Sequence, residues 1–307
     1  MLTCEVVSGK ETVYAFEKDV NVERIALFEE GLGKLSKKIC LVLVEPKGYE
    51  RPYALECKRK LIDMLKGEGF LGQNTLVEFK SLSGGSKTFE LYTYEYFQTL
   101  TLTYIIEALI EAEKEGYDAA TVACCLDSGI QQARGILEMP VVGIMESVFA
   151  AAHAMGARRR SVGMITMNKN DLPKTDAIID QYGFRPCMLP VKPVRDIPTE
   201  IYLNASTLLD KKNIEEAKAA YVRAARELVK DGAQLLITAC GGLGPLMAIN
   251  GIDEVEGVPV LDPITAGLKM AEVVVDYRKQ GSYKGKRSGL TEGDLKRGRS
   301  YFGLSSS

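Results

Sequence analysis

Short apolar runs alternate with longer stretches of helical periodicity along most of this chain, and this alternation constrains its fold more than any other feature. The runs are nearly continuous in apolar character, which is typical of parallel strands covered by helices on both faces. We expect strands at residues 38–44, 75–79, 120–124, 140–144, 161–166, 185–191, 234–240 and 258–261. We expect helices at residues 53–65, 96–114, 130–137, 147–155, 174–181, 214–230 and 264–275. The order of these elements predicts an α/β fold with mostly parallel sheets.

A weak internal repeat suggests that these elements form two similar lobes. Residues 118–124 begin one copy and residues 233–240 begin the other. In each copy a strand ends in Ala-Cys and is followed by a small-residue loop, a helix and a second strand that opens at a Pro. At 307 residues the chain is long enough for two lobes, each with its own core. The repeat places two cysteines at equivalent, opposed positions.

The two ends of the chain lie outside this repeated core. Residues 1–37 precede the first buried run and include a Gly- and Lys-rich stretch that suits an exposed connection. The tail, residues 278–307, carries eight basic and two acidic residues between Arg278 and Arg299. It is either an arm that grips an acidic partner or a neighbouring subunit, or a solvated and partly disordered terminus. The composition favours the second interpretation.

Composition excludes several classes of protein. Apolar residues make up 46% of the chain and charged residues 26%, as in ordinary globular proteins. No apolar run approaches the ~18 residues of a membrane span. The net charge of -2 gives no basic field for nucleic acid. We therefore expect neither a membrane nor a nucleic acid as a partner.

Cysteine is the residue type most available for chemistry. The chain has no Trp, seven Cys and a single His, His153, which excludes any mechanism or metal site that needs two imidazoles. His153 is expected to pack on a helix or to be partly exposed. The odd number of Cys, the lack of a C-x-x-C pair and a polar N-terminus without a secretory signal indicate reduced thiols and a cytoplasmic location. Cys40, Cys57 and Cys187 are expected to be inert buried residues, and Cys4 to lie near the surface.

Cys124 and Cys240 occupy positions better suited to chemistry. Each ends a predicted parallel strand, at the edge where such sheets bind ligands, and each precedes a loop of small residues and a helix. Backbone N–H groups and the helix N-terminus would favour anionic oxygens there and lower the pKa of the thiol from about 8.5 towards neutrality. A single Cys at a strand end is more often a packing residue, but a duplicated pair supplies what a 1,1-proton transfer needs. One group removes the α-proton and the other returns a proton to the opposite face, with no cofactor if backbone donors stabilise the enolate.

The motifs around these cysteines, taken in order, resemble those of the Asp/Glu/hydantoin racemase superfamily, and most of all its hydantoin and allantoin racemase branch. The resemblance extends from Lys38 to Val275. It is carried by Ala123-Cys-Cys-Leu-Asp-Ser-Gly129, Pro140 to Glu146, Ala239-Cys-Gly-Gly-Leu243 and Val258 to Asp262, with Asp171-Leu-Pro-Lys-Thr and Gln181-Tyr-Gly-Phe between them. The first motif assigns the catalytic role to Cys124 rather than to Cys125.

The resemblance implies two pseudo-symmetric lobes, each a mostly parallel sheet flanked by helices, with the active site in the cleft between them. It implies a discontinuous first lobe of residues 38–145 plus 263–277, and a second lobe of residues 146–262. Cys124 and Cys240 would be the opposed acid/base pair, with no cofactor. The expected substrate-binding groups are main-chain donors around Asp127, Ser128, Gly241 and Gly242, with Thr166 near the far wall.

Two segments depart from the family pattern. Hydantoin racemases open their first strand into an Asn-Pro-Asn-Thr-Ser turn, of which this chain keeps only Pro46. Either Lys47, Tyr49 or Arg51 contacts an acidic or larger substrate, or this loop is simply solvated. Tyr96 lies where the family often has a Gly-His-Tyr-Asp stretch, and it either lines the pocket or packs.

These observations favour a cofactor-independent racemase or epimerase that acts on a small molecule, at a carbon beside a carbonyl in a hydantoin-like ring or an amino-acid derivative. One alternative keeps the fold but makes the cysteine-dependent reaction a decarboxylation, isomerisation, hydrolysis or desulfuration. Decarboxylases of the superfamily lack the first Cys, so its presence counts against them. The other alternative is a non-catalytic, two-lobed binding protein. We expect a homo-oligomer, since most soluble oligomers are of this kind.

Overall fold

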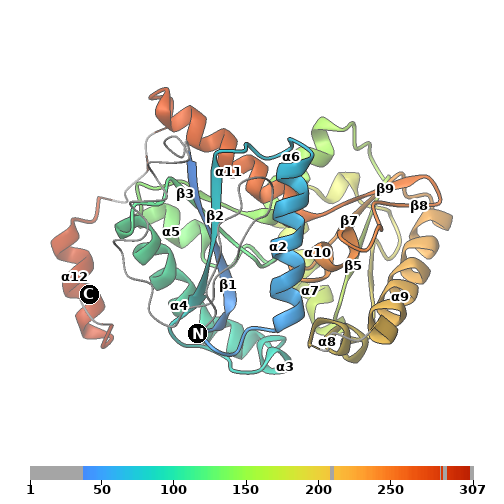
Figure 1. Cartoon of the computed structure of the whole chain (residues 1–307), viewed down its shortest axis with the longest axis horizontal. Coiled ribbons are helices and arrows are strands. Elements are labelled where there is room, and N and C mark those ends of the chain that lie inside the picture. The colour runs from blue at the N-terminus through green and yellow to red at the C-terminus, as the bar shows by residue number, and fades with distance from the viewer. Residues whose placement is uncertain (1–36, 208–210, 284, 286–288, 305–307) are drawn as a thin grey trace, which may run out of the picture. The chain divides into compact units, whose positions relative to one another are not determined.

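The structure is a computed structural model that describes residues 37–207, 211–283, 285 and 289–304. The described residues form two sheets flanked by helices, which confirms the predicted α/β fold (Figure 1). Cys4 and nearly all of the predicted N-terminal extension lie outside the described residues. No helix in the described ranges is long and apolar enough to cross a membrane.

The first sheet is fully parallel, with strand order β2-β1-β3-β4. Its strands are β1 (Lys37–Pro46), β2 (Thr75–Leu82), β3 (Ala119–Val122) and β4 (Val141–Val142). Successive side chains of β1 alternate between two buried clusters, with Ile39 and Leu41 in one and Cys40 and Val42 in the other. Both faces of the strand are covered, which explains its continuous apolar run.

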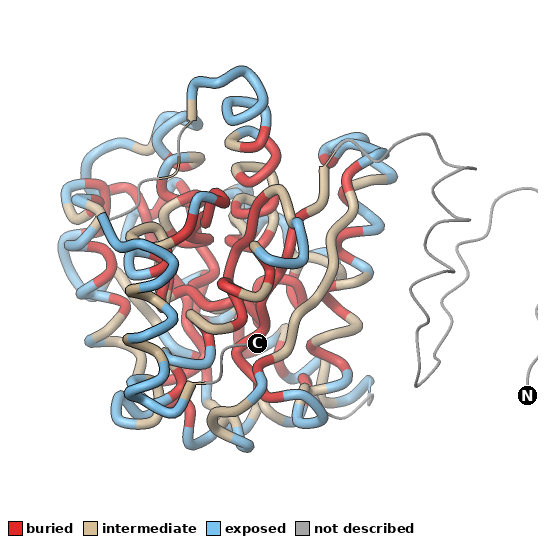
Figure 2. The backbone as a smooth tube through the Cα atoms, turned by 90° about the vertical axis from the view of Figure 1, so that its left-hand side faces the viewer, coloured by how far each residue is buried: buried red, intermediate tan, exposed pale blue. Residues whose placement is uncertain are grey.

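The second sheet has strand order β6-β5-β7-β9-β8 and is parallel except for the β8–β9 pair. Its strands are β5 (Val162–Thr166), β6 (Val194–Asp196), β7 (Leu235–Thr238), β8 (Glu254–Val255) and β9 (Val258–Leu261). Met164 and Ile237 pack into the same core cluster as Leu41 of the first sheet. The two sheets therefore share a central core, where buried backbone is concentrated in Figure 2.

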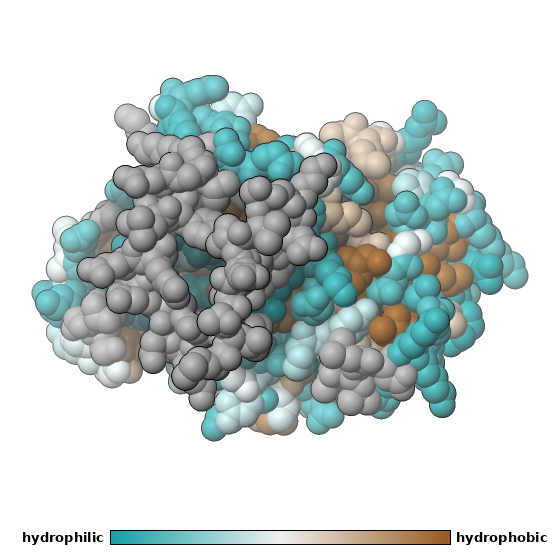
Figure 3. Space-filling view, viewed as in Figure 1, coloured by the Kyte–Doolittle hydropathy of each residue, from teal (hydrophilic) through white to brown (hydrophobic). Residues whose placement is uncertain are grey.

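The helices follow most of the predicted ranges. In chain order they are α2 (Pro52–Gly67), α3 (Phe89–Tyr92), α4 (Glu95–Lys114), α5 (Ile130–Ile136), α6 (Ile144–Ala154), α7 (Leu172–Gln181), α8 (Thr199–Thr207), α9 (Lys211–Lys230), α10 (Leu243–Ala248), α11 (Pro263–Lys279) and α12 (Glu292–Tyr301). Helix α2 packs against elements of both sheets, with Leu61 in the shared core and Tyr53 and Cys57 in the cluster beneath the second sheet. On the face shown in Figure 3, the coloured atoms are mainly hydrophilic and the hydrophobic ones form small, separate groups.

The internal repeat corresponds to two equivalent units of structure. In the first, β3 leads through the Cys124 loop into α5 and then β4, and in the second, β7 leads through the Cys240 loop into α10 and then β9. Each cysteine lies two residues beyond the end of its strand. The sequence repeat therefore places both thiols at the carboxyl ends of parallel strands.

The predicted strand at residues 185–191 is wrong. Residues Arg185–Cys187 form a 3-10 helix, and only an isolated bridge between Met188 and Val162 joins this segment to the sheet. The segment contains Pro186 and Pro190, and a proline has no N–H to donate to a ladder. The edge strand begins later in the chain, at β6.

The composition predicts a solvated and partly disordered tail; α12 is largely exposed, as expected, but it is an ordered helix. Thr291 and Asp294 form a capping box at the start of this helix. The guanidinium of Arg299 pairs with Glu107 of α4, with Nε 3.0 Å from Oε1. The tail is thus folded against the first-sheet side of the chain in this region.

The predicted lobe boundaries at residues 145/146 and 262/263 fall beside two helices that pack on each other, α6 and α11. Strands of the first sheet all precede residue 143, and described strands of the second sheet all lie between residues 162 and 261. The helices at the predicted crossings belong to the core shared by both sheets. The boundaries themselves stay a prediction.

Candidate active site

A cavity lies at the carboxyl ends of β1, β3 and β7, where the two repeated loops meet. Its volume is about 50 Å³, which is small beside the ~300–1,000 Å³ of most small-molecule pockets. A substrate therefore either is small or enters when the walls move apart. The polar and titratable residues that line the cavity are Glu45, Arg51, Lys58, Tyr92, Thr93, Gln98, Cys124, Cys125, Asp171, Thr175 and Cys240.

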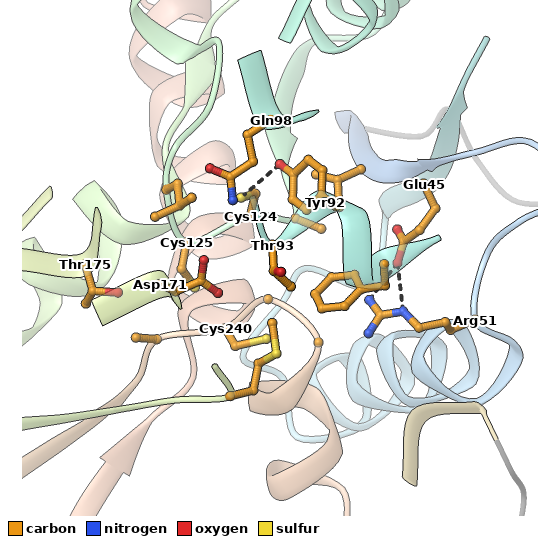
Figure 4. Close-up of a pocket in the computed structure, with 18 of the residues that line it drawn as sticks. Glu45, Arg51, Tyr92, Thr93, Gln98, Cys124, Cys125, Asp171, Thr175 and Cys240 are labelled. Carbon is orange, nitrogen blue, oxygen red and sulfur yellow. Dashed lines mark hydrogen bonds and ion pairs between the residues drawn. The ribbon is translucent and has the colours of Figure 1, made fainter. Parts of the chain in front are cut away.

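Cys124 is 8% exposed and contacts two hydroxyl groups. Its sulfur lies 3.5 Å from the phenol oxygen of Tyr92 and 3.8 Å from the hydroxyl of Ser128. Figure 4 shows the Tyr92 contact as a dashed line. Burial keeps the pKa of Tyr92 well above its usual value, so the phenol stays protonated and can donate to this sulfur.

Cys240 has a more electropositive setting. The backbone N–H of Leu243, the first residue of α10, lies 3.4 Å from its sulfur. The N–H of Gly242 and the positive charge of Arg51 also favour its thiolate. In the view of Figure 4, Cys240 and Cys124 approach the cavity from opposite sides. Each repeat unit therefore contributes one thiol.

The expectation that these loops lower the thiol pKa values towards neutrality is wrong. Burial raises the pKa of both Cys124 and Cys240 above the ordinary value, and the hydrogen bonds and the Arg51 charge offset this only in part. Both thiols are therefore protonated at neutral pH in this structure. Cys240 has a cation and two N–H groups as partners, and Cys124 has hydroxyl groups and one N–H but no cation. The difference in charge makes Cys240 the better candidate for the thiolate.

The two cysteine loops touch through their backbones. A methyl group at Gly241 would lie 2.5 Å from the carbonyl oxygen of Ala123 and 3.3 Å from the backbone nitrogen of Cys124. Such distances are shorter than real carbon contacts, so no side chain fits at this position. The glycine therefore allows the two thiols to share one cavity.

Arg51 and Glu45 form a buried ion pair on one wall. The Arg51 guanidinium donates to Glu45 Oε1 from Nη2 at 2.6 Å and from Nε at 3.1 Å, and from Nη1 to the Tyr202 phenol at 2.6 Å. It also lies 3.9 Å from the centre of the Phe89 ring. Burial alone would raise the pKa of Glu45, but the charges of Arg51 and Lys58 hold it below its usual range. The pair is thus ionised, and its charges cancel.

A second set of polar contacts joins the two halves of the chain on the opposite wall of the cavity. Lys174 pairs with Asp171 at 2.9 Å and donates to the backbone oxygen of Thr93 at 2.8 Å. Asp171 lies beside the second sheet and Thr93 follows α3, next to the first. This contact and the Arg51–Tyr202 bond join the two halves on either side of the cavity, and both would have to loosen if the walls separate.

The predicted site residues divide into two groups. Cys124, Cys240, Gly241 and Gly242 line the cavity. The other predicted residues are not among the lining residues: Pro46, Lys47, Tyr96, Asp127, Ser128 and Thr166. Their substrate-binding roles stay predictions.

Several residues of this second group have contacts that suggest supporting roles. Ser128 contacts the Cys124 sulfur, and Thr166 donates at 3.4 Å to the backbone oxygen of Ala239, the residue before Cys240. Lys47 is exposed, and the Tyr96 ring is 68% exposed. Ser128 and Thr166 therefore touch the cysteine loops, whereas Lys47 and Tyr96 face solvent.

Of the charged wall, only Arg51 was named from the sequence, as one of three residues that could contact an acidic substrate, and it lines the cavity. Glu45 and Lys58 were missed. Glu45 ends an apolar run, and Lys58 is buried in α2, whose other lysines are exposed or half-buried. A charged residue on the core-facing side of an amphipathic helix is the signal that could have identified Lys58.

Asp127 holds the start of α6 in place. Its carboxylate accepts the backbone N–H groups of Met145 at 3.0 Å and Glu146 at 2.9 Å, and the Tyr182 phenol at 2.8 Å. We predict that Asp127→Ala lowers the free energy of unfolding by about 1–3 kcal/mol, because buried donors lose their acceptor. Chemical denaturation measures this. The exposed Asp176, changed to Ala, is the control and should cost less than about 0.5 kcal/mol; equal stability of the two variants would contradict the role.

Comparison with known proteins gives the family. The sequence model described as Asp/Glu/Hydantoin racemase matches residues 58–271, more than half of the chain. The chain belongs to this family. The racemase is 31% identical over 200 residues to a hydantoin racemase of Pseudomonas sp. (strain NS671), covering 64% of this chain and 73% of that protein. It is 30% identical over 185 residues to a hydantoin racemase of Rhizobium meliloti, covering 58% and 68% respectively.

Solved structures share the fold of this racemase. An allantoin racemase from Pseudomonas fluorescens superposes with a TM-score of 0.62 at 19% identity, over 83% of this chain and 98% of that one. An allantoin racemase from Klebsiella pneumoniae gives a TM-score of 0.57 at 20% identity, over 85% and 93%. These likenesses confirm the two-sheet architecture. The family and its racemase relatives identify the chain as an isomerase of the racemase class.

Proposed function

We propose that this racemase inverts a carbon beside a carbonyl, in a hydantoin-like ring or an amino-acid derivative, by a cofactor-independent 1,1-proton transfer between Cys124 and Cys240. The observation that carries the proposal is the convergence of two repeat-related thiols on one cavity, from opposite sides. The hydantoin racemases among the relatives indicate the substrate class.

The steps follow from the positions of the thiols. One cysteine, as thiolate, takes the α-proton and becomes a thiol, and the carbon's electron pair moves into an enolate. The other cysteine donates its proton to the opposite face and becomes the thiolate. The product has the inverted configuration, and the protonation states of the two cysteines are exchanged. Backbone N–H groups in the two loops would stabilise the charge of the enolate.

The charges around the two thiols differ, and this difference indicates which cysteine is the thiolate before the first proton transfer. Arg51 and the N–H groups of Gly242 and Leu243 favour a Cys240 thiolate. The hydroxyl of Tyr92 contacts Cys124 as a neutral donor. We therefore propose that the resting active form carries the thiolate on Cys240 and the proton on Cys124.

The raised thiol pKa values predict an alkaline pH profile. Catalysis needs one thiolate and one thiol, and burial leaves both protonated at pH 7. We predict that kcat/KM rises about tenfold per pH unit and still rises when the pH passes about 8.5, the usual cysteine pKa. It should fall only when the second thiol ionises. Initial rates between pH 6 and 10 measure this. A plateau already reached at pH 7 would contradict it.

The reaction itself is tested with single enantiomers. We would incubate the protein with each enantiomer of a panel of 5-substituted hydantoins and amino acids, and follow optical rotation and product mass. Loss of optical rotation without a change of mass supports racemisation. A changed product mass would indicate a different cysteine-dependent reaction, and saturable binding without turnover would indicate a binding protein; either would overturn the proposal.

The assembly is proposed separately from the reaction. We propose a homo-oligomer, in keeping with the prevalence of symmetric assemblies among soluble enzymes. Light scattering after size-exclusion chromatography measures the mass in solution against 33.7 kDa for one chain. A mass equal to that of one chain at all concentrations would exclude the oligomer.

A further inference from the structure

We propose that Lys58 binds a carboxylate of the substrate, so that the racemase acts on anionic hydantoins or amino-acid derivatives in preference to neutral ones. The inference rests on the proposed function, since it names the substrate class of the same site. It concerns a side chain that the racemisation steps do not use.

Lys58 is buried to a degree that is unusual for a lysine. It is 3% exposed, and lysines are almost never this buried unless they are paired. Its ammonium group donates to the backbone oxygen of Ala54, one turn earlier in α2, at the long distance of 3.4 Å. An ammonium has three donors, so this bond leaves most of its capacity for another partner.

The charges around the cavity leave Lys58 without a matching anion. Among the described residues, Lys58 takes part in no ion pair, because Glu45 is bonded to Arg51. On the opposite wall, Asp171 is paired with Lys174. Of the described charged residues that line the cavity, only Lys58 is outside an ion pair; it interacts electrostatically with Glu45 and with the buried Asp262 without pairing with either. An unpaired cation in a buried site is costly, and a bound anion would remove that cost.

Lys58 lies in the right place to contact a substrate. It lines the same cavity as both thiols, and it interacts electrostatically with Cys240. A carboxylate on the substituent of the reacting carbon would meet it on the α2 wall. Burial lowers the pKa of Lys58, which Glu45 opposes in part, and an anion beside the amine would favour its charged form further.

A carboxylate that is present throughout the reaction is a better partner for Lys58 than the enolate, because it keeps the buried amine charged in every step. The enolate exists only briefly, and its stabilisation would affect every substrate through kcat. A carboxylate is present before and after the reaction, so its recognition affects KM and only substrates that carry it. The two possibilities therefore separate in kinetics.

The test compares two substrates that differ only in charge. Racemisation of hydantoin-5-acetic acid and of hydantoin-5-acetamide is measured at pH 8 with wild type, Lys58→Met and Lys60→Met. Lys60 is on the same helix but exposed, and pairs with Glu56. We expect wild type and Lys60→Met to prefer the acid by about 10- to 100-fold in kcat/KM, the size of a charged hydrogen bond. Lys58→Met should lose this preference through KM. Because Lys58 also interacts electrostatically with Cys240, any change in kcat should be the same for the acid and the amide.

Further measurements distinguish a failure of this inference from a folding defect and from a failure of the proposed function. We expect the ligand-free Lys58→Met protein to melt no lower than wild type, because the substitution removes a buried charge. Racemisation of the amide with no preference for the acid in wild type would overturn the inference and leave the proposed function intact. Equal losses on both substrates through kcat, with the preference for the acid kept in Lys58→Met, would also overturn it. No racemisation of either hydantoin, with the acid still raising the wild-type melting temperature more than the amide does, would overturn the proposed function and leave anion binding at Lys58.

Discussion

Changing either Cys124 or Cys240 to serine is expected to lower kcat for racemisation by at least ~10³-fold, the upper part of the range for one acid or base. A serine hydroxyl does not ionise near neutral pH, so the new serine cannot act as the base in one direction and is a much weaker acid than a thiol in the other. Each thiol acts as base in one direction and as acid in the other, and both directions should therefore fail in both variants.

Cys125 provides a matched control for this prediction. It is adjacent to Cys124 and lines the same cavity, but its sulfur faces the backbone oxygen of Thr238 at 4.0 Å. Burial raises its pKa well above the usual value, further from any acid/base role. Cys125→Ser should change kcat less than about tenfold. Chiral chromatography of the product measures all three variants, and racemisation that survives Cys124→Ser or Cys240→Ser would rule out the two-base mechanism.

Gly241→Ala is expected to lower kcat/KM by about 100-fold, the second largest effect. The added methyl group would lie 2.5 Å from the carbonyl oxygen and 2.8 Å from the carbonyl carbon of Ala123. Backbone atoms cannot give way as a flexible side chain can, so the two cysteine loops must move apart. A displacement of about 1 Å in a catalytic pair costs on the order of 10²-fold.

Gly135→Ala separates this effect from glycine substitution in general. Gly135 is in α5, with open space where a methyl group would lie and without a positive φ. This variant should keep full activity and gain up to about 1 kcal/mol of stability, as expected for Ala in place of Gly in a helix. Steady-state kinetics and thermal unfolding measure both variants. Full activity in Gly241→Ala would show that the loops do not need their close approach.

The fold was predictable because buried parallel strands leave a direct trace in sequence. The apolar run of β1 reflects two covered faces, and the Ala-Cys repeat reflects two equivalent strand-loop-helix units. The prediction failed at one segment, where an apolar run contains prolines. Residues 185–191 look like a strand in apolar content, but Pro186 and Pro190 have no N–H to donate to a ladder, and Arg185–Cys187 form a 3-10 helix instead.

The thiols of the site were predictable and their surroundings were not. Cys124 and Cys240 belong to motifs at strand ends, whereas Glu45, Tyr92 and Lys58 come from other elements that only the tertiary fold brings to the same cavity. The direction of the thiol pKa shifts was also missed. Loop chemistry favours the thiolate, but burial acts in the opposite direction and is the larger effect here.

The most direct measurement of the two-cysteine mechanism is the position of deuterium early in the reaction. A single enantiomer of a 5-substituted hydantoin is incubated with the enzyme in deuterated water, and both enantiomers are separated at low conversion and analysed by NMR, with correction for uncatalysed exchange. The two-base mechanism predicts that the newly formed enantiomer carries deuterium at the inverted carbon, because its proton comes from a second, solvent-exchanged thiol. The remaining substrate should keep its original proton. Deuterium in the recovered substrate at a rate equal to that in the product would contradict the mechanism, because it would mean that a single base serves both faces.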